Sequence, residues 1–338
     1  MNLVRAEVER LAARRFVQLM VVLLAAAFVV TAATTLVGSH RPSAGELSAA
    51  QLQAAQAVAE MEAEHTRCLR IKAGEIPLTA DSGYVPADCS ELDPVRMAQL
   101  PVAADYLSSV FVFSQQAEGL LYFLIAFLVL FGFLVGASYI GADLNSGGVV
   151  NLLLWRPGRL TVLGAKLGTL IGVVAALSAV ASVIYLGTFW TIGQTAGLPG
   201  PLDGEFWGKL GATYGRGMVL VLLASVLGFG IATLGRHTSA ALGAVAAYAV
   251  VWELGTRLVL EIVDVARPDQ LMLSSYLGAW LTGRVEFWDD SLRCASGGSF
   301  CSGGIYSITW LPALLVLLAV TGTVTVAAFA VFRRRDLL

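Results

Sequence analysis

The sequence predicts an all-α polytopic membrane protein, and three observations support this fold class. Of its 338 residues, 57% are hydrophobic and only 14% are charged, whereas soluble domains average roughly 25% charged residues. Six apolar runs reach the length of about 20 residues that a helix needs to cross a bilayer. The connecting segments fall into two groups that differ in charge and in cysteine content, as a membrane topology requires.

Arginines precede the first apolar run, so a cleaved signal peptide is an alternative there. That run is, however, longer than the roughly 7–15 residues of a signal peptide's apolar core. The predicted spans are residues 16–37, 119–141, 163–190, 218–235, 240–262 and 308–332. The remaining segments are an N-terminal helix at 1–15, an insert at 38–118, loops at 142–162, 191–217 and 263–307, and a tail at 333–338.

Basic residues near the helix ends predict the orientation, because such residues concentrate on the cytoplasmic side. With the N-terminus inside, the basic residues on that side are Arg5, Arg10, Arg14, Arg15, Arg156, Arg159, Lys166, Arg236, Arg333, Arg334 and Arg335. Only four acids share it: Glu7, Glu9, Asp143 and Asp336. We therefore expect both termini in the cytoplasm.

The cysteines give an independent indication of the same orientation. All four lie in loops that the charge pattern places outside, where disulfides persist. Four cysteines allow three pairings, and we expect the local ones, Cys68–Cys89 and Cys294–Cys301. Free thiols are an alternative, and so is a zinc site at His65 and Cys68, although no further ligands stand at metal spacing.

Residues 1–15 have the pattern of a short amphipathic helix that lies at the membrane interface. Leu3, Val4, Val8 and Leu11 share one face and the charged residues take the other. A solvated basic leader is the alternative.

Residues 38–118 are long enough to form a small helical domain outside the membrane. Ser43 and Glu46 form a capping-box pattern, which predicts a helix that begins there and runs to about Ile71. The insert either contacts a ligand or only stabilises the fold. In the last outer loop, the stretch LMLSSYLGAWLTG at 271–283 is apolar but too short to span. It predicts a re-entrant or interfacial helix pair, followed by a hairpin that a disulfide closes.

Ionisable residues within a span indicate a functional role by default. Glu253 and Arg257 stand four apart in the fifth span, so they predict either a polar contact in a translocation path or an internal ion pair. Phe123, Phe127 and Phe131 form an aromatic face in the second span. This face either lines a cavity for apolar cargo or packs against other helices.

Glycines at intervals of four predict close helix–helix packing in two spans. They are Gly132 and Gly136 in the second span and Gly164, Gly168 and Gly172 in the third.

The sequence lacks the motifs of an enzyme. A phosphate-binding loop needs Gly-x4-Gly-Lys-Ser/Thr, and Leu210 follows the nearest match, Gly208-Lys209. No catalytic dyad or metal motif is present, so we expect no cofactor in this chain. The net charge of −2 argues against a nucleic-acid partner.

Residues 141–159, between the second and third spans, read GADLNSGGVVNLLLWRPGR. An acidic residue, Asp143, precedes the pair Gly147-Gly148, a leucine-rich helix at 152–154 and a turn at 156–159. This order, with Lys166 after it, resembles the permease subunits of type-two ATP-binding-cassette exporters of bacteria, which also have six spans. The chain departs from that family's pattern in having Asp143 where Glu is usual and Gly148 where Thr is usual.

The resemblance implies that this loop is a coupling helix that docks on a separate cytoplasmic ATPase. The candidate coupling residues are Asp143, Asn145, Ser146, Val149, Val150, Leu153, Leu154, Arg156 and Arg159. ATP and Mg would then bind the partner ATPase, and a second permease copy, identical or a sibling, would complete the exporter. The implied cargo is a hydrophobic or amphipathic compound moved outward across the bacterial cytoplasmic membrane. A membrane sensor or scaffold with a ligand-binding external insert is the alternative.

Overall fold

The structure, a computed structural model, describes residues 3–77, 88–97, 100–146, 158–263, 265, 267–289 and 304–334. In this part of the chain six helical segments are long and apolar enough to cross a membrane, so the predicted class of an all-α polytopic membrane protein is confirmed. Five are continuous helices of 23–37 residues, whereas the fifth span is divided into three helical segments. The chain forms two compact units, residues 1–29, 117–186 and 203–338 in the first and residues 30–116 and 187–202 in the second.

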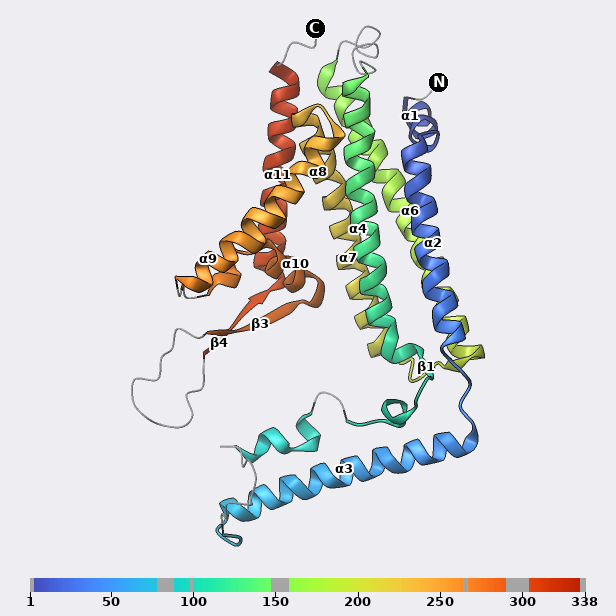
Figure 1. The fold of residues 1–338 in the computed structure, drawn as a ribbon, viewed down its shortest axis with the longest axis vertical. Helices are drawn as coiled ribbons and strands as arrows, with labels where there is room; N and C mark the ends of the chain where they lie inside the picture. Colours follow the sequence, from blue (N-terminus) through green and yellow to red (C-terminus); the bar gives the residue numbers. More distant parts are fainter. Residues whose placement is uncertain are drawn as a thin grey trace. The chain divides into compact units, whose positions relative to one another are not determined.

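The short helix α1 (Leu3–Ala12) precedes the first span. The spans are α2 (Arg15–Val37), α4 (Phe113–Asn145), α6 (Arg159–Thr195), α7 (Gly204–Gly235), the composite of α8 (Thr238–Ala247), η4 (Tyr248–Thr256) and α9 (Arg257–Ile262), and α11 (Trp310–Arg334). Figure 1 shows the start of α1 and the end of α11 at the same end of the first unit.

The fourth span is longer than predicted, because α7 begins at Gly204 inside the expected loop 191–217. The Asp203 carboxylate accepts a hydrogen bond of 2.8 Å from the Phe206 amide and caps the helix. The glycines in this segment favour a loop, but the Asp203 cap starts the helix before them, and α7 continues through them into the apolar run.

Glycines allow α4 and α7 to pack closely. A methyl group at Gly136 would lie 2.3 Å from the carbonyl oxygen of Ser225, and one at Gly228 would lie 2.3 Å from that of Phe133. The predicted role of the Gly132 and Gly136 pair is therefore supported by these contacts. The ladder in α6 differs, because nothing lies within 4 Å of a methyl group added at Gly164, Gly168 or Gly172 in the described part of the chain.

The helix α10 (Leu273–Thr282) fills the region between α7 and α11. Ala279 and Trp280 are buried against Leu220 of α7 and Leu317 of α11. The indole N–H of Trp280 donates to the Arg216 carbonyl at 2.8 Å. The stretch that predicted a pair of helices thus forms a single one, which Gly283 ends with a left-handed φ of 91°.

The predicted hairpin follows α10. Strands β3 (Arg284–Asp289) and β4 (Gly304–Thr309) pair antiparallel and return the chain to α11.

The second unit is built on α3 (Ala44–Lys72), which the sequence predicts almost to the residue. The Ser43 hydroxyl accepts from the Glu46 amide, and the Glu46 carboxylate accepts from the Ser43 amide at 2.7 Å. The pKa of Glu46 lies below its ordinary value, because the amide and then the hydroxyl of Ser43 hydrogen-bond to its carboxylate. Short 3₁₀ turns η1 (Cys89–Leu92), η2 (Pro94–Arg96) and η3 (Ala103–Tyr106) follow α3 along the chain.

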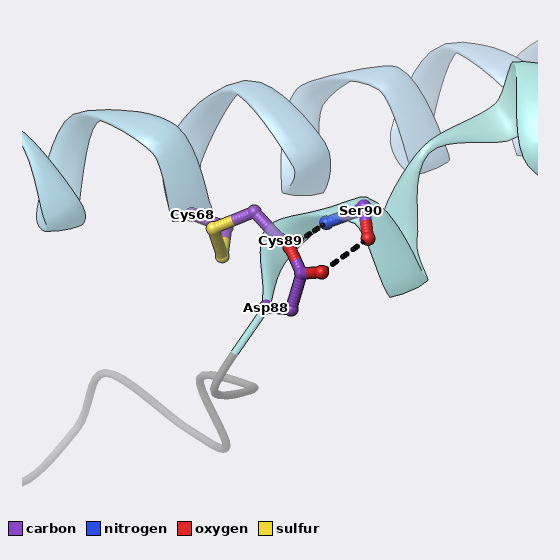
Figure 2. The surroundings of a disulfide bond; sticks show 4 residues. All are labelled: Cys68, Asp88, Cys89 and Ser90. Atoms are coloured by element: carbon purple, nitrogen blue, oxygen red, sulfur yellow. Dashed lines mark hydrogen bonds between the residues drawn. A yellow bond between two sulfur atoms is a disulfide. The ribbon is translucent and has the colours of Figure 1, made fainter.

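A disulfide closes the second unit. Cys68 near the end of α3 is bonded to Cys89 of η1, with their Cα atoms 5.8 Å apart, so this predicted pairing is confirmed (Figure 2). Beside it, the Asp88 carboxylate accepts from the Ser90 hydroxyl and amide, which lowers the pKa of Asp88. The disulfide also removes Cys68 as a zinc ligand. Cys294 and Cys301 lie outside the described residues.

A two-residue parallel ladder joins the ends of this unit. Strand β1 (Phe111–Val112) pairs with β2 (Gly197–Leu198), and the Ser39 hydroxyl donates to the Ala196 carbonyl while it accepts from the Phe111 amide.

The contrast between the two glycine ladders predicts opposite effects of one methyl group. Gly136→Ala should lower the free energy of unfolding by about 1–3 kcal/mol, because the methyl group overlaps the α7 backbone. Gly168→Ala should leave it unchanged or raise it by up to about 1 kcal/mol, because alanine favours a helix and the site is open. Denaturation in detergent, followed by circular dichroism, measures both variants. Equal stabilities would contradict the close packing of α4 on α7.

Candidate functional site

Five ionic or polar side chains meet at the end of the first unit where α1 begins. Lys166, about two turns after the start of α6, is 1% exposed and lies at the centre of this group. Its Nζ donates to Glu7 Oε2 of α1 and to Asp143 Oδ2 of α4, each at 2.8 Å. We call the group of Glu7, Arg14, Tyr139, Asp143 and Lys166 the charge cluster.

Arg14 and Tyr139 complete the charge cluster. The Arg14 guanidinium, in the link between α1 and α2, donates to Asp143 Oδ1 and, at 3.1 Å, to the Ser138 carbonyl of α4. The fully buried Tyr139 donates its hydroxyl to Glu7. Its ring centroid lies 4.8 Å from Lys166 Nζ and 5.2 Å from Arg14 Cζ, distances at which cations are attracted to an aromatic face.

The charges of the cluster balance, with two carboxylates against one ammonium and one guanidinium. Each buried ion costs several kcal/mol of desolvation, which is offset only by good geometry and by hydrogen bonds to the remaining polar atoms. Arg10 adds a further cation, 3.6 Å from Glu7 Oε1 at the exposed rim. The arrangement thus holds α1, α4 and α6 in one relative position.

The charge cluster lies directly beside the segment that the sequence singles out. Asp143 and Asn145 are in the last turn of α4, Ser146 directly follows that helix, and Arg159 is the first residue of α6. The segment that joins them, 147–157, lies outside the described residues, with the predicted coupling residues Val149, Val150, Leu153, Leu154 and Arg156. Four of the nine predicted coupling residues lie in the described part of the chain, and of these Asp143 contributes its carboxylate to the charge cluster.

The sequence reading missed the partners of Asp143. The amphipathic pattern placed Glu7 on the polar face of α1, but the structure buries it at 2% exposure while Val8 is 37% exposed. That assignment was wrong because hydrogen bonds from Tyr139 and Lys166 make burial of the Glu7 carboxylate favourable. The charge pattern and the family resemblance both include Lys166 but predict no partner for it, although a lysine within an apolar run itself indicates a functional or structural role.

The proposed pairing of Glu253 with Arg257 is not formed. Arg257 Nε lies 3.1 Å from Glu261 Oε1, and its Nη2 lies 3.6 Å from Asp269 Oδ1. The residues around Glu253 form a π-helix, η4, whose i→i+5 hydrogen bonds change the spacing on which an i,i+4 pair depends.

Glu253 instead caps α10. Its carboxylate accepts from the Ser274 amide at 3.0 Å, from the Ser274 hydroxyl at 2.8 Å and from the Tyr248 hydroxyl at 2.9 Å. The Tyr248 oxygen accepts from the Leu273 amide at 3.2 Å. Two amides at the start of α10, which have no partner inside that helix, are thus satisfied by η4.

The three phenylalanines of the predicted aromatic face have different surroundings. Phe123 and Phe127 of α4, with ring centroids 4.7 Å apart, line a cavity of about 550 Å³ in the first unit. Phe131 is 5% exposed and is not among the lining residues. The face therefore serves both cavity and packing.

Comparison of the chain with models of known protein families, with curated proteins and with solved structures finds no match.

The charge cluster predicts a large stability difference between two lysine variants. Lys166→Met keeps the length of the side chain but removes the buried ammonium that bridges Glu7 and Asp143, so we expect a loss of about 3–5 kcal/mol in unfolding free energy. Lys209→Met is the control, because its ion pair with Glu118 is largely exposed at 3.1 Å and should contribute no more than about 1 kcal/mol. Thermal unfolding in detergent compares the variants. A Lys166→Met loss no larger than that of the control would show that the cluster does not brace the helices.

The capping contact predicts a local effect at α10. Glu253→Ala should raise amide hydrogen exchange at Ser274 about tenfold or more, since a hydrogen bond to a charged acceptor contributes about 1.5–3 kcal/mol. Glu261→Ala, which removes a carboxylate bonded to Arg257 on α9, serves as the control and should leave α10 unchanged. Similar exchange in the two variants would contradict the cap.

Proposed function

We propose that this chain is the membrane-spanning permease subunit of an ATP-binding-cassette exporter, powered by a separate ATPase. The observation that carries the proposal is the charge cluster, which ties α1, α4 and α6 together beside both ends of the segment 147–157. A loop that only connected two spans would not need a buried ionic brace at its base.

The cluster suits the transmission of force from this segment. Asp143 lies four residues before 147, and Lys166 lies nine residues after 157, so the 2.8 Å contact between their side chains joins the two helices that the segment connects. Glu7 and Arg14 extend the same network to α1 and to the start of α2. A push on the segment would therefore move three helices together rather than one loop.

The composition of the segment suits a docking surface. Val149 and Leu153, or Val150 and Leu154, stand four apart in the sequence, so in a helix each pair would share one face and could anchor it in a groove of the partner. Asn145 or Ser146 would cap that helix, and Arg156 before Pro157 would end it. In this proposal the segment faces the cytoplasm, as the distribution of basic residues predicts.

In this proposal the energy for transport comes from a partner, since the sequence lacks a phosphate-binding loop. ATP and Mg would bind the partner ATPase, whose closure would change the angle between the braced helices and expose the cargo path alternately to the two sides. The cargo class consistent with the apolar spans is a hydrophobic or amphipathic compound, moved outward by a dimer of permeases.

The test co-expresses the chain with any ATPase that carries a phosphate-binding loop and is encoded beside its gene. Leu153→Asp should abolish co-purification and transport-linked ATP hydrolysis, because a charge replaces the apolar anchor. Asn151→Asp, two residues away, adds the same charge at a polar position and should retain both activities. Retention of ATPase binding and stimulated hydrolysis by Leu153→Asp would refute the coupling role. The absence of any ATPase partner would favour a membrane sensor or scaffold instead.

A further inference from the structure

The residues that line the cavity beside Phe123 and Phe127 restrict the kind of ligand that it can bind. Its walls come from α2, α4 and α6 of the first unit, and its volume of about 550 Å³ falls within the roughly 300–1,000 Å³ of small-molecule sites. Every described lining side chain is aliphatic or aromatic, and Tyr185 supplies the only hydroxyl among them. Water needs two to four polar partners to occupy a site, so this cavity favours hydrocarbon over water.

The cavity has a buried floor and an exposed rim. Leu124 and Tyr185 on the floor are 3% and 2% exposed, whereas Val180 and Ile184 at the rim are 60% and 54% exposed. The Phe28 ring, 5.4 Å from that of Tyr185, also lines the cavity. The opening is thus on the apolar outer surface of the spans, where acyl chains are the solvent.

The cavity is elongated along the helix axes. Its lining residues on α6 run from Val173 to Tyr185, a distance of about 18 Å at 1.5 Å per residue. This is more than half of the roughly 30 Å hydrocarbon thickness of a bilayer. A slot of this length, parallel to the spans, fits a flexible chain better than a compact ring system.

We propose that this cavity is a binding site for a single alkyl chain. The ligand enters laterally from the bilayer, and its chain lies along α6 between α2 and the paired rings of Phe123 and Phe127. The chain belongs either to a membrane lipid or to a free single-chain amphiphile, and both share the chemistry that the lining recognises. The site is independent of the proposed export function, because its occupancy requires no ATPase.

The experiment uses the full chain in phosphatidylcholine nanodiscs. The first probe is a phosphatidylcholine with a photoreactive diazirine in its acyl chain, and the second is a free fatty acid with the same group. After illumination, mass spectrometry locates the labelled residues. We expect saturable labelling of the lining segments of α2 and α6, whereas labelling of the lipid-facing surface of α11 should rise in proportion to the probe.

Neighbouring alanines in α2 offer a matched control. Ala25 lines the cavity and Ala26 does not, although both are exposed. Ala25→Trp should fill the slot and reduce the saturable labelling about tenfold, equivalent to a loss of ~1.4 kcal/mol of binding free energy. Ala26→Trp adds the same ring outside the slot and should retain the labelling. Ala25→Phe and Ala26→Phe repeat the comparison if the larger ring impairs folding.

The two probes distinguish the source of the chain. Saturable labelling by the phospholipid that free fatty acid does not displace identifies a bilayer lipid, and displacement identifies a free amphiphile. Either result supports the site. Labelling that does not saturate, or an equal loss in the Ala25 and Ala26 variants, overturns it.

Discussion

The fold of the first unit depends on the burial of one ammonium group. Lys166 is 1% exposed, and a lysine in an apolar environment is costly unless anions reach it with good geometry. Glu7 and Asp143 do so from two other helices, each at 2.8 Å. This requirement holds α1 against the bundle, fixes the ends of α4 and α6 side by side, and thereby fixes both ends of the segment between them.

A second constraint acts where helices end in apolar surroundings, because each helix leaves its first amides without an internal partner. Glu253 and Tyr248 meet this requirement for α10, and both lie in the π-helical η4. The π-helical geometry of η4 thus has a structural role, because both side chains reach the start of α10 from it. Glu253 and Lys166, two charges in apolar runs, thus stabilise the fold through different partners.

The sequence predicts what local patterns determine. Hydropathy and length give the six spans, and the Ser43–Glu46 capping box gives α3 because its hydrogen bonds are made within four residues. Long-range contacts escape such patterns. Glu7 and Lys166 are 159 residues apart, so a helical wheel of α1 treats Glu7 as a solvated charge. The spacing of Glu253 and Arg257 was misleading because it assumes α-helical geometry where the chain forms a π-helix.

The charge cluster and the apolar cavity are connected by the helices that carry them. Lys166 and Val173 of α6 are seven residues apart, about 10 Å along a helix, and α4 carries both Asp143 and Phe127. Packed helices behave as stiff bodies whose interiors resist compression. A change in the angle between α4 and α6 at the cluster must therefore widen or narrow the cavity further along, unless one helix bends. Because the Tyr139 ring contacts both cations and its hydroxyl donates to Glu7, the cluster would act as the pivot of the motion proposed above.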